Sequence, residues 1–160
     1  MSDQEILRQR AAVLARRERE VVATVRVDHA VFRLAREAYA IEVAALKQIF
    51  PLRDLARLPG ARAPLIGLTA WRGGLLRVID LLAALGRTQG GIADQGRVLV
   101  IGQPDAGEFG VLVDAVEDVI QLSDEDVKAA PSGETNSLVR GVTRDAVLVL
   151  DAPEMLRRFG

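Results

Sequence analysis

The chain has 160 residues, of which 49% are hydrophobic and 27% are charged, a balance typical of a folded globular protein. Its 21 basic and 22 acidic side chains leave a formal net charge of −1, which argues against a dedicated nucleic-acid binder. The sequence has no cysteine and a single histidine, His29, so thiol chemistry and most Ser-His-Asp arrangements are excluded.

Residues 1–25 are predicted to form a helical extension. Leu7, Leu14 and Val21 recur at a spacing of seven residues, with arginines and glutamates between them. This pattern suits a helix that docks on its own domain, a helix that self-associates or binds a partner, or a partly frayed tail. The segment has no apolar core of a secretory signal, and no run in the chain approaches the roughly 18 apolar residues of a membrane-spanning helix. We therefore expect a cytoplasmic protein without direct membrane insertion.

From Arg26 onward the pattern changes to short, β-branched runs separated by turn residues, which predicts an all-β domain over residues 26–160. Hairpins or turns are expected at Gly73–Gly74, at residues 104–107 and at Arg144–Asp145. The predicted strands cover residues 31–34, 38–43, 98–101, 110–113, 116–120, 138–142 and 146–150.

An internal repeat relates two parts of this domain. Residues 38–52 align without gaps on residues 108–122, and further on Gly67 and Asp80 find counterparts in Gly141 and Asp151. Chance similarity between β-rich segments is the alternative, but the matches keep their order and include glycine and aspartate. The repeat predicts two small five-stranded β-barrels, with the repeat segments at about 31–85 and 98–157.

Asp80 and Asp151 are predicted to be helix caps rather than catalytic carboxylates. Asp80 precedes a short apolar run that ends at Gly86, and Asp151 is followed by Pro153 and by Glu154 in a capping-box pattern. Each cap is worth about 1 kcal/mol. A short helix is therefore expected to close each barrel.

The sequence offers little chemistry for an enzyme, a cofactor or a metal ion. It lacks the glycine-rich phosphate-binding patterns, and the acidic run 124–126 lacks the glycine and the alternating ligands of a calcium loop. His29 by itself is expected to be a hydrogen-bonded surface or edge residue. Aromatic residues are only 4% of the chain, which disfavours stacking on nucleic-acid bases. We expect a protein-binding module with no catalytic residues, no cofactor and no metal.

Several segments taken together resemble the CheW-like domain family. They are residues 31–34, 39–41, 66–73 (Ile-Gly-Leu-Thr-Ala-Trp-Arg-Gly), 78–81 (Val-Ile-Asp-Leu) and 110–116, and the resemblance covers about Asp28 to Phe159. It implies two SH3-like barrels in a pseudo-two-fold pair. It also implies a non-enzymatic adapter that is recruited to receptor arrays. There the adapter would couple chemoreceptor tips to the regulatory domain of a CheA-type histidine kinase.

The resemblance implies receptor contacts at four positions, which are Arg72, Gly67, Leu46 and Gln48. Arg72 falls at the arginine of the family's receptor-coupling segment, in which Trp71 stands where leucine is frequent. Gln48 replaces a residue that is commonly acidic. An internal tie between the two barrels is the alternative role for Arg72. The alternative function is a small β-barrel that binds another protein or nucleic acid without a kinase partner.

Overall fold

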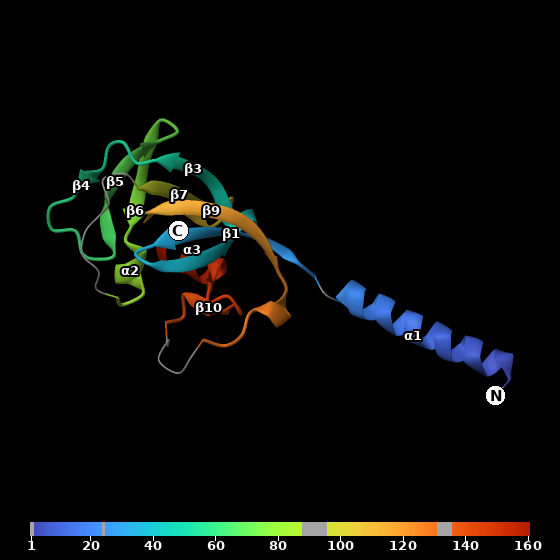
Figure 1. The fold of residues 1–160 in the computed structure, drawn as a ribbon. Helices are drawn as coiled ribbons and strands as arrows, with labels where there is room; N and C mark the ends of the chain where they lie inside the picture. Colours follow the sequence, from blue (N-terminus) through green and yellow to red (C-terminus); the bar gives the residue numbers. More distant parts are fainter. Residues whose placement is uncertain (1, 24, 88–95, 131–135) are drawn as a thin grey trace.

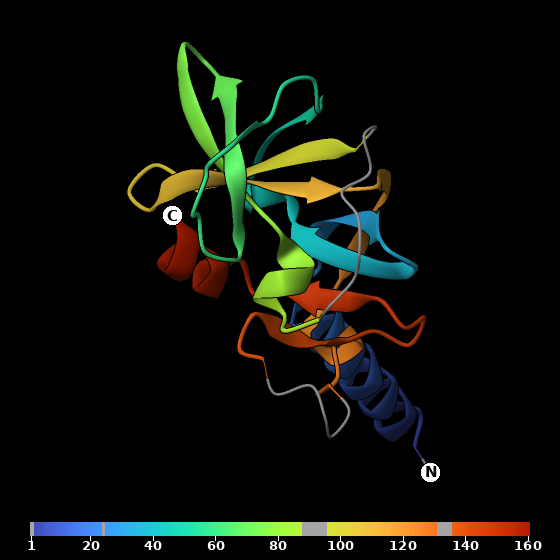
Figure 2. The same cartoon turned by 90° about the vertical axis from the view of Figure 1, so that its left-hand side faces the viewer.

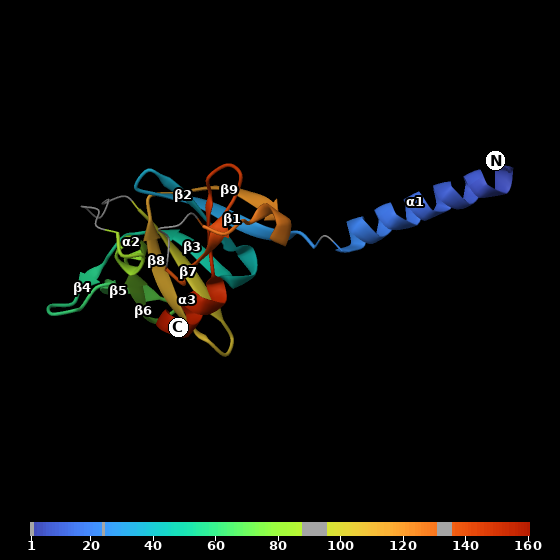
Figure 3. The same ribbon diagram turned by 90° about the horizontal axis from the view of Figure 1, so that it is seen from below.

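The computed structural model describes residues 2–23, 25–87, 96–130 and 136–160, with the backbone alone for 15–23. Helix α1 spans Asp3–Ala23, and Figures 1 and 3 show it standing away from the rest of the chain. The large apolar side chains of its first half, Ile6, Leu7, Val13 and Leu14, are exposed. The helix is therefore not docked on its own domain. None of the helices in these ranges is both long and apolar enough to span a membrane.

Two β-sheets form the framework of the chain after α1 (Figure 2). Sheet A has five strands, in the spatial order β10 (Val139–Val142), β11 (Leu148–Leu150), β2 (Glu37–Glu42), β1 (Val27–Leu34) and β9 (Ala115–Leu122). Sheet B has six strands, in the order β3 (Leu46–Pro51), β7 (Arg97–Gln103), β8 (Gly107–Val113), β6 (Gly74–Ile79), β5 (Leu65–Trp71) and β4 (Ala56–Arg57). The short elements are α2 (Leu81–Ala84), α3 (Ala152–Phe159) and two 3-10 turns, η1 (Val43–Ala45) and η2 (Asp124–Asp126).

The repeat is visible in the strand order, but each sheet takes strands from both copies. The hairpin β1–β2 lies in sheet A beside β9, β10 and β11 of the second copy, and the hairpin β7–β8 lies in sheet B beside β3, β5 and β6 of the first. The parallel pair between Val78 and Gly110 in sheet B corresponds to the parallel pair between Val149 and Ala40 in sheet A. The segments 31–85 and 98–157 therefore exchange strands, and neither forms a sheet alone.

Buried side chains form three clusters, and strands β1, β2, β7 and β8 are buried on both faces. In β7, Leu99 and Ile101 face the central cluster between the sheets, whereas Val98 and Val100 face a cluster within sheet B. Sheet A has a smaller cluster of its own. Burial on both faces explains why these strands are continuous apolar runs rather than alternating ones. Helices α2 and α3 complete the central cluster with Leu81, Leu82, Met155 and Leu156.

Sheet B curls around its own cluster. Phe50 of β3 stacks on Trp71 of β5 with ring centroids 5.7 Å apart, although β7, β8 and β6 lie between these strands in the sheet order. Among the described residues, however, no pairing joins β10 to β9 or β3 to β4. The mostly-β prediction is confirmed, but the described strands form sheets of five and six strands with no closing pair, where two five-stranded barrels were predicted.

Candidate interaction surface

Arg72 lies at the tip of the hairpin between β5 and β6. Trp71 and Gly74 pair across this hairpin, so its two-residue turn is Arg72–Gly73, one residue earlier than predicted. The φ angles of 46° at Arg72 and 74° at Gly73 place both residues in the left-handed region, as in a type I′ turn. This conformation crowds the Cβ atom of an arginine. The local backbone preference at this position is therefore for glycine or asparagine.

Trp71 lies beneath the Arg72 side chain. The guanidinium carbon of Arg72 is 4.7 Å from the Trp71 ring centroid, which is within cation–π range. The indole is 8% exposed and stacks on Phe50 with an angle of 13° between the ring planes. Its Nε1–H donates to Oε1 of Glu108 at 3.1 Å. Arg72 is exposed and contacts its own hairpin, which argues against the internal tie between the two sheets.

The predicted contacts on β3 lie on a strand that leads toward this tip. Gln48 is exposed and pairs with Val100 of β7, while Leu46 is half-buried and packs against the central cluster. Phe50, two residues after Gln48, makes the contact with Trp71. The structure thus connects β3 with the Arg72 hairpin through one aromatic pair, which the sequence patterns did not reveal.

Gly67 has a different role from that expected of a direct contact. It is buried in β5 opposite Arg57 of β4, and an alanine Cβ there would lie 2.3 Å from the carbonyl oxygen of Ala56. Its counterpart Gly141 lies equally close to the carbonyl oxygen of Lys128, at 2.3 Å. Both glycines therefore permit a close approach between backbone segments, and Gly67 has no side chain to offer a partner.

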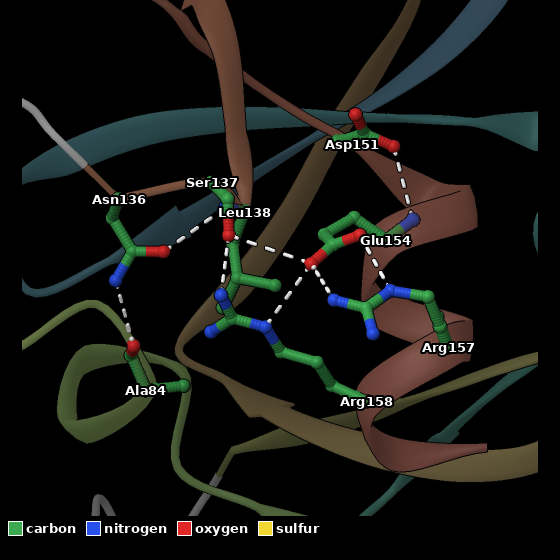
Figure 4. Close-up of polar contacts among 8 residues, drawn as sticks. All are labelled: Ala84, Asn136, Ser137, Leu138, Asp151, Glu154, Arg157 and Arg158. Carbon is green, nitrogen blue, oxygen red and sulfur yellow. Dashed lines mark hydrogen bonds and ion pairs between the residues drawn. The ribbon is translucent and has the colours of Figure 1, made fainter.

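Asp80 and Asp151 cap the two short helices. Oδ1 of Asp80 accepts a hydrogen bond from the Ala83 amide at 3.2 Å, and Oδ1 of Asp151 accepts one from the Glu154 amide at 3.0 Å (Figure 4). The backbone amide of Asp151 donates to the Leu138 carbonyl at 2.8 Å. It is therefore not available to the Glu154 side chain, so the expected reciprocal half of the capping box is wrong.

The Glu154 carboxylate instead binds two arginines of its own helix. Arg157 donates to both of its oxygens, and Arg158 donates to Oε1 at 3.2 Å (Figure 4). The hydrogen bonds from Arg157, and then the positive charge of both arginines, lower the pKa of Glu154 from 4.5 to about 2. Ser137 also contacts this group, so the carboxylate links α3 to the segment that precedes β10.

His29 is buried in β1 rather than at the surface or the sheet edge. Its side chain is 1% exposed, and Nδ1–H donates to the Val27 carbonyl at 2.8 Å. Because a carbonyl can only accept, Nδ1 carries the proton in the neutral ring. Within the described parts of the chain, no group of three or more histidine, aspartate or glutamate side chains could hold a metal ion.

The comparison with protein families agrees with this fold. A model of the CheW-like domain matches residues 28–159. The chain belongs to the CheW-like family. It is similar to the chemotaxis protein CheW of Bacillus subtilis, with 33% identity over 103 residues, and to that of Rhizobium meliloti, with 29% identity over 114 residues. These matches cover 64% and 69% of this chain and 65% and 73% of the two relatives, so the Bacillus match spans just under two thirds of that relative.

A solved structure has the same fold. It is the scaffolding protein TtCheW of Thermoanaerobacter tengcongensis, which superposes with a TM-score of 0.69 at 21% identity. The match covers 79% of this chain and 90% of that protein.

Proposed function

We propose that this CheW-like chain is a non-enzymatic adapter. It couples chemoreceptors, the methyl-accepting chemotaxis proteins, to a CheA-type histidine kinase in a chemosensory two-component pathway that controls motility. The observation that carries the proposal is the family match over residues 28–159, together with relatives that are named as chemotaxis proteins. The division into a helical extension at 1–25 and a CheW-like domain at 26–160 belongs to the same proposal.

The receptor contact is proposed at the Arg72 hairpin. A receptor tip presents helices, and an exposed guanidinium offers several directed donors to a helix carboxylate or to backbone carbonyls. Leu75, beside the turn, is 73% exposed and adds apolar surface next to that charge. Leu46 and Gln48 on β3 are proposed as further receptor contacts, and Gly67 supports them indirectly by holding β4 on β5.

The kinase contact is proposed at the ends of the curled sheets. The regulatory domain of a CheA-type kinase would share this architecture, so two similar SH3-like units would meet through apolar ends. The curl of sheet B around its own cluster supports such units. In this proposal the chain works in the cytoplasm, where its two partners recruit it to receptor arrays.

Calorimetric titration of the purified chain with the regulatory domain of the organism's own CheA-type kinase tests the proposal. We expect binding in the micromolar range, and binding of a receptor-tip fragment that Arg72→Ala weakens without changing the circular dichroism spectrum. An absence of binding to every such kinase and receptor in the genome would refute the adapter function. Binding to a labelled oligonucleotide at low salt would then favour the alternative, because electrostatic binding is strongest there.

A further inference from the structure

We propose that Trp71 is a positioning residue that holds the Arg72 guanidinium ready for a carboxylate on the partner. The inference rests on the proposed receptor contact at Arg72. In this proposal Trp71 orients the Arg72 side chain and does not itself contact the partner.

The indole is well placed to act as a fixed support. Phe50 stacks on the ring, and the hydrogen bond from Nε1 to Glu108 orients it within its plane. The support therefore rests on three strands, β3, β5 and β8. An arginine at an exposed hairpin tip otherwise samples many rotamers, and a partner that binds it must order them at a cost in affinity. Stacking on a fixed indole restricts those rotamers before the partner arrives.

The donors of Arg72 remain available while its position is restricted. Among the described residues Arg72 forms no ion pair, even though Glu108 accepts a hydrogen bond from the ring on which Arg72 lies. A guanidinium that stacks through its face keeps its N–H groups at its edge. Those edge donors suit a carboxylate, which can accept two parallel hydrogen bonds.

Among the described residues, the groove at the corresponding end of sheet A has no aromatic residue in its lining. In sheet A, Ala38 corresponds to Glu108 and Val147 corresponds to Leu76. That end of sheet A has an open groove, which is lined by Val31, Ala38, Val147 and Leu148 among others. The described residues at this end of sheet A therefore leave an open groove, whereas sheet B has a packed indole. Trp71 belongs to the buried cluster of sheet B, and the support of Arg72 is a second role that we add to this packing.

The first test needs no partner. In the wild-type chain, ring currents of the indole should shift the Arg72 side-chain proton resonances upfield in NMR spectra. Trp71→Leu should return them to ordinary positions, and Trp71→Phe should keep part of the shift. Ordinary resonance positions in the wild-type chain would overturn the proposal, whether or not the adapter function holds.

The second test is a double-mutant cycle with a receptor-tip fragment. Trp71→Leu should weaken binding about two- to fivefold, the equivalent of one exposed cation–π contact. In the Arg72→Ala background the same change should have no further effect. Trp71→Phe keeps an aromatic face and more of the packing, so its affinity for the fragment should lie between those of Trp71→Leu and the wild type. An equal loss in both backgrounds would overturn the proposal, because Trp71 would then act independently of Arg72.

The two tests separate the two hypotheses. If the wild-type chain shows the shifted Arg72 resonances but binds no receptor fragment, the proposed receptor contact is wrong. The role of Trp71 in receptor binding is then wrong as well. If the fragment binds and the cycle shows no coupling, the adapter function stands and the positioning role fails. Thermal melting of each variant identifies any loss that comes from unfolding.

Discussion

Replacing Gly67 with alanine should destabilise the protein, because the backbone of β4 occupies the space that a side chain would need. The new Cβ would lie 2.3 Å from the Ala56 carbonyl oxygen, whereas ordinary contacts begin near 3.4 Å. Strand β4 would have to move away by about 1 Å, which is the difference between these distances. That movement strains the pairs Ala56–Leu68 and Arg57–Gly67, which hold β4 on β5.

The magnitude follows from two contributions. Overpacking a tight site costs about 1–3 kcal/mol, and each backbone hydrogen bond that is lost or weakened costs about 1 kcal/mol. Since an edge strand can relax toward solvent, we expect a loss of about 2–3 kcal/mol in the free energy of unfolding. For a chain of this length, that loss corresponds to a melting temperature lower by about 4–12 °C.

Urea and thermal denaturation followed by circular dichroism measure this effect. Gly141→Ala, which meets the Lys128 carbonyl at the same 2.3 Å, should be destabilised to a similar extent. Gly74→Ala is the matched control, because its nearest contact would be the Trp71 carbonyl at 3.7 Å. The steric explanation would be refuted if Gly67→Ala had the melting temperature of the wild type. It would also be refuted if Gly74→Ala lost as much unfolding free energy as Gly67→Ala.

Three further perturbations test the helix caps, the Arg72 turn and the Glu154 carboxylate. Asp80→Ala and Asp151→Ala should each lower the free energy of unfolding by about 1 kcal/mol in urea titrations. Asparagine at either position should restore most of that loss, and an alanine variant without any loss would contradict the capping role. Arg72→Asn should be about 1 kcal/mol more stable than Arg72→Ala, because asparagine tolerates a positive φ; equal stabilities would mean that the turn is not left-handed. The pKa of Glu154 is lowered from 4.5 to about 2 in the folded state. Its contribution to stability is therefore complete above pH 4.5 and is lost as the pH falls toward 2, so melting temperatures of Glu154→Gln should fall less over this interval than those of the wild type. Parallel pH profiles would show that the carboxylate contributes nothing.

The repeat allowed the paired structural residues to be predicted, but not the exchange of strands between the copies. The equivalence of Asp80 with Asp151 followed from order and spacing, and both side chains cap helices in the structure. The exchange depends on which of two similar strands, far apart in the sequence, a given strand pairs with. Strand β2 has the same local pattern whether it pairs with β6 or with β11, so periodicity cannot distinguish these pairings. Only the packing of the whole chain selects β11.

Strands β3, β5 and β6 were absent from the predicted strands, although a hairpin or turn was predicted at Gly73–Gly74. Lys47, Gln48 and Ile49 are consecutive exposed residues, so β3 shows no alternation, and its conformation is set by pairing with β7. At the hairpin, the Gly73–Gly74 dipeptide suggested the turn. The observed turn places Arg72 in a left-handed conformation that propensity disfavours.

His29 shows the same limit for a single polar residue. A lone histidine near a strand start was expected at the surface or the sheet edge, because polar side chains are usually exposed. Strand β1 lies between β2 and β9, and this position buries the ring almost completely. The Val27 carbonyl satisfies Nδ1, which reduces the cost of burying it. His29 is buried because β1 lies inside the sheet, and the local sequence pattern does not predict that position.

The two copies agree where the backbone is crowded and differ where side chains reach the surface. Gly67 and Gly141 meet a carbonyl oxygen at the same distance, so the fold imposes the same constraint on both. The ends of the sheets do not share this close approach of backbone segments, and there the two copies differ. One end has Arg72 supported by Trp71, and the other has the open groove beside β2 and β11. If the proposed adapter function holds, this asymmetry would give the receptor and the kinase two different surfaces, whereas a symmetric pair of sheets would offer one surface twice.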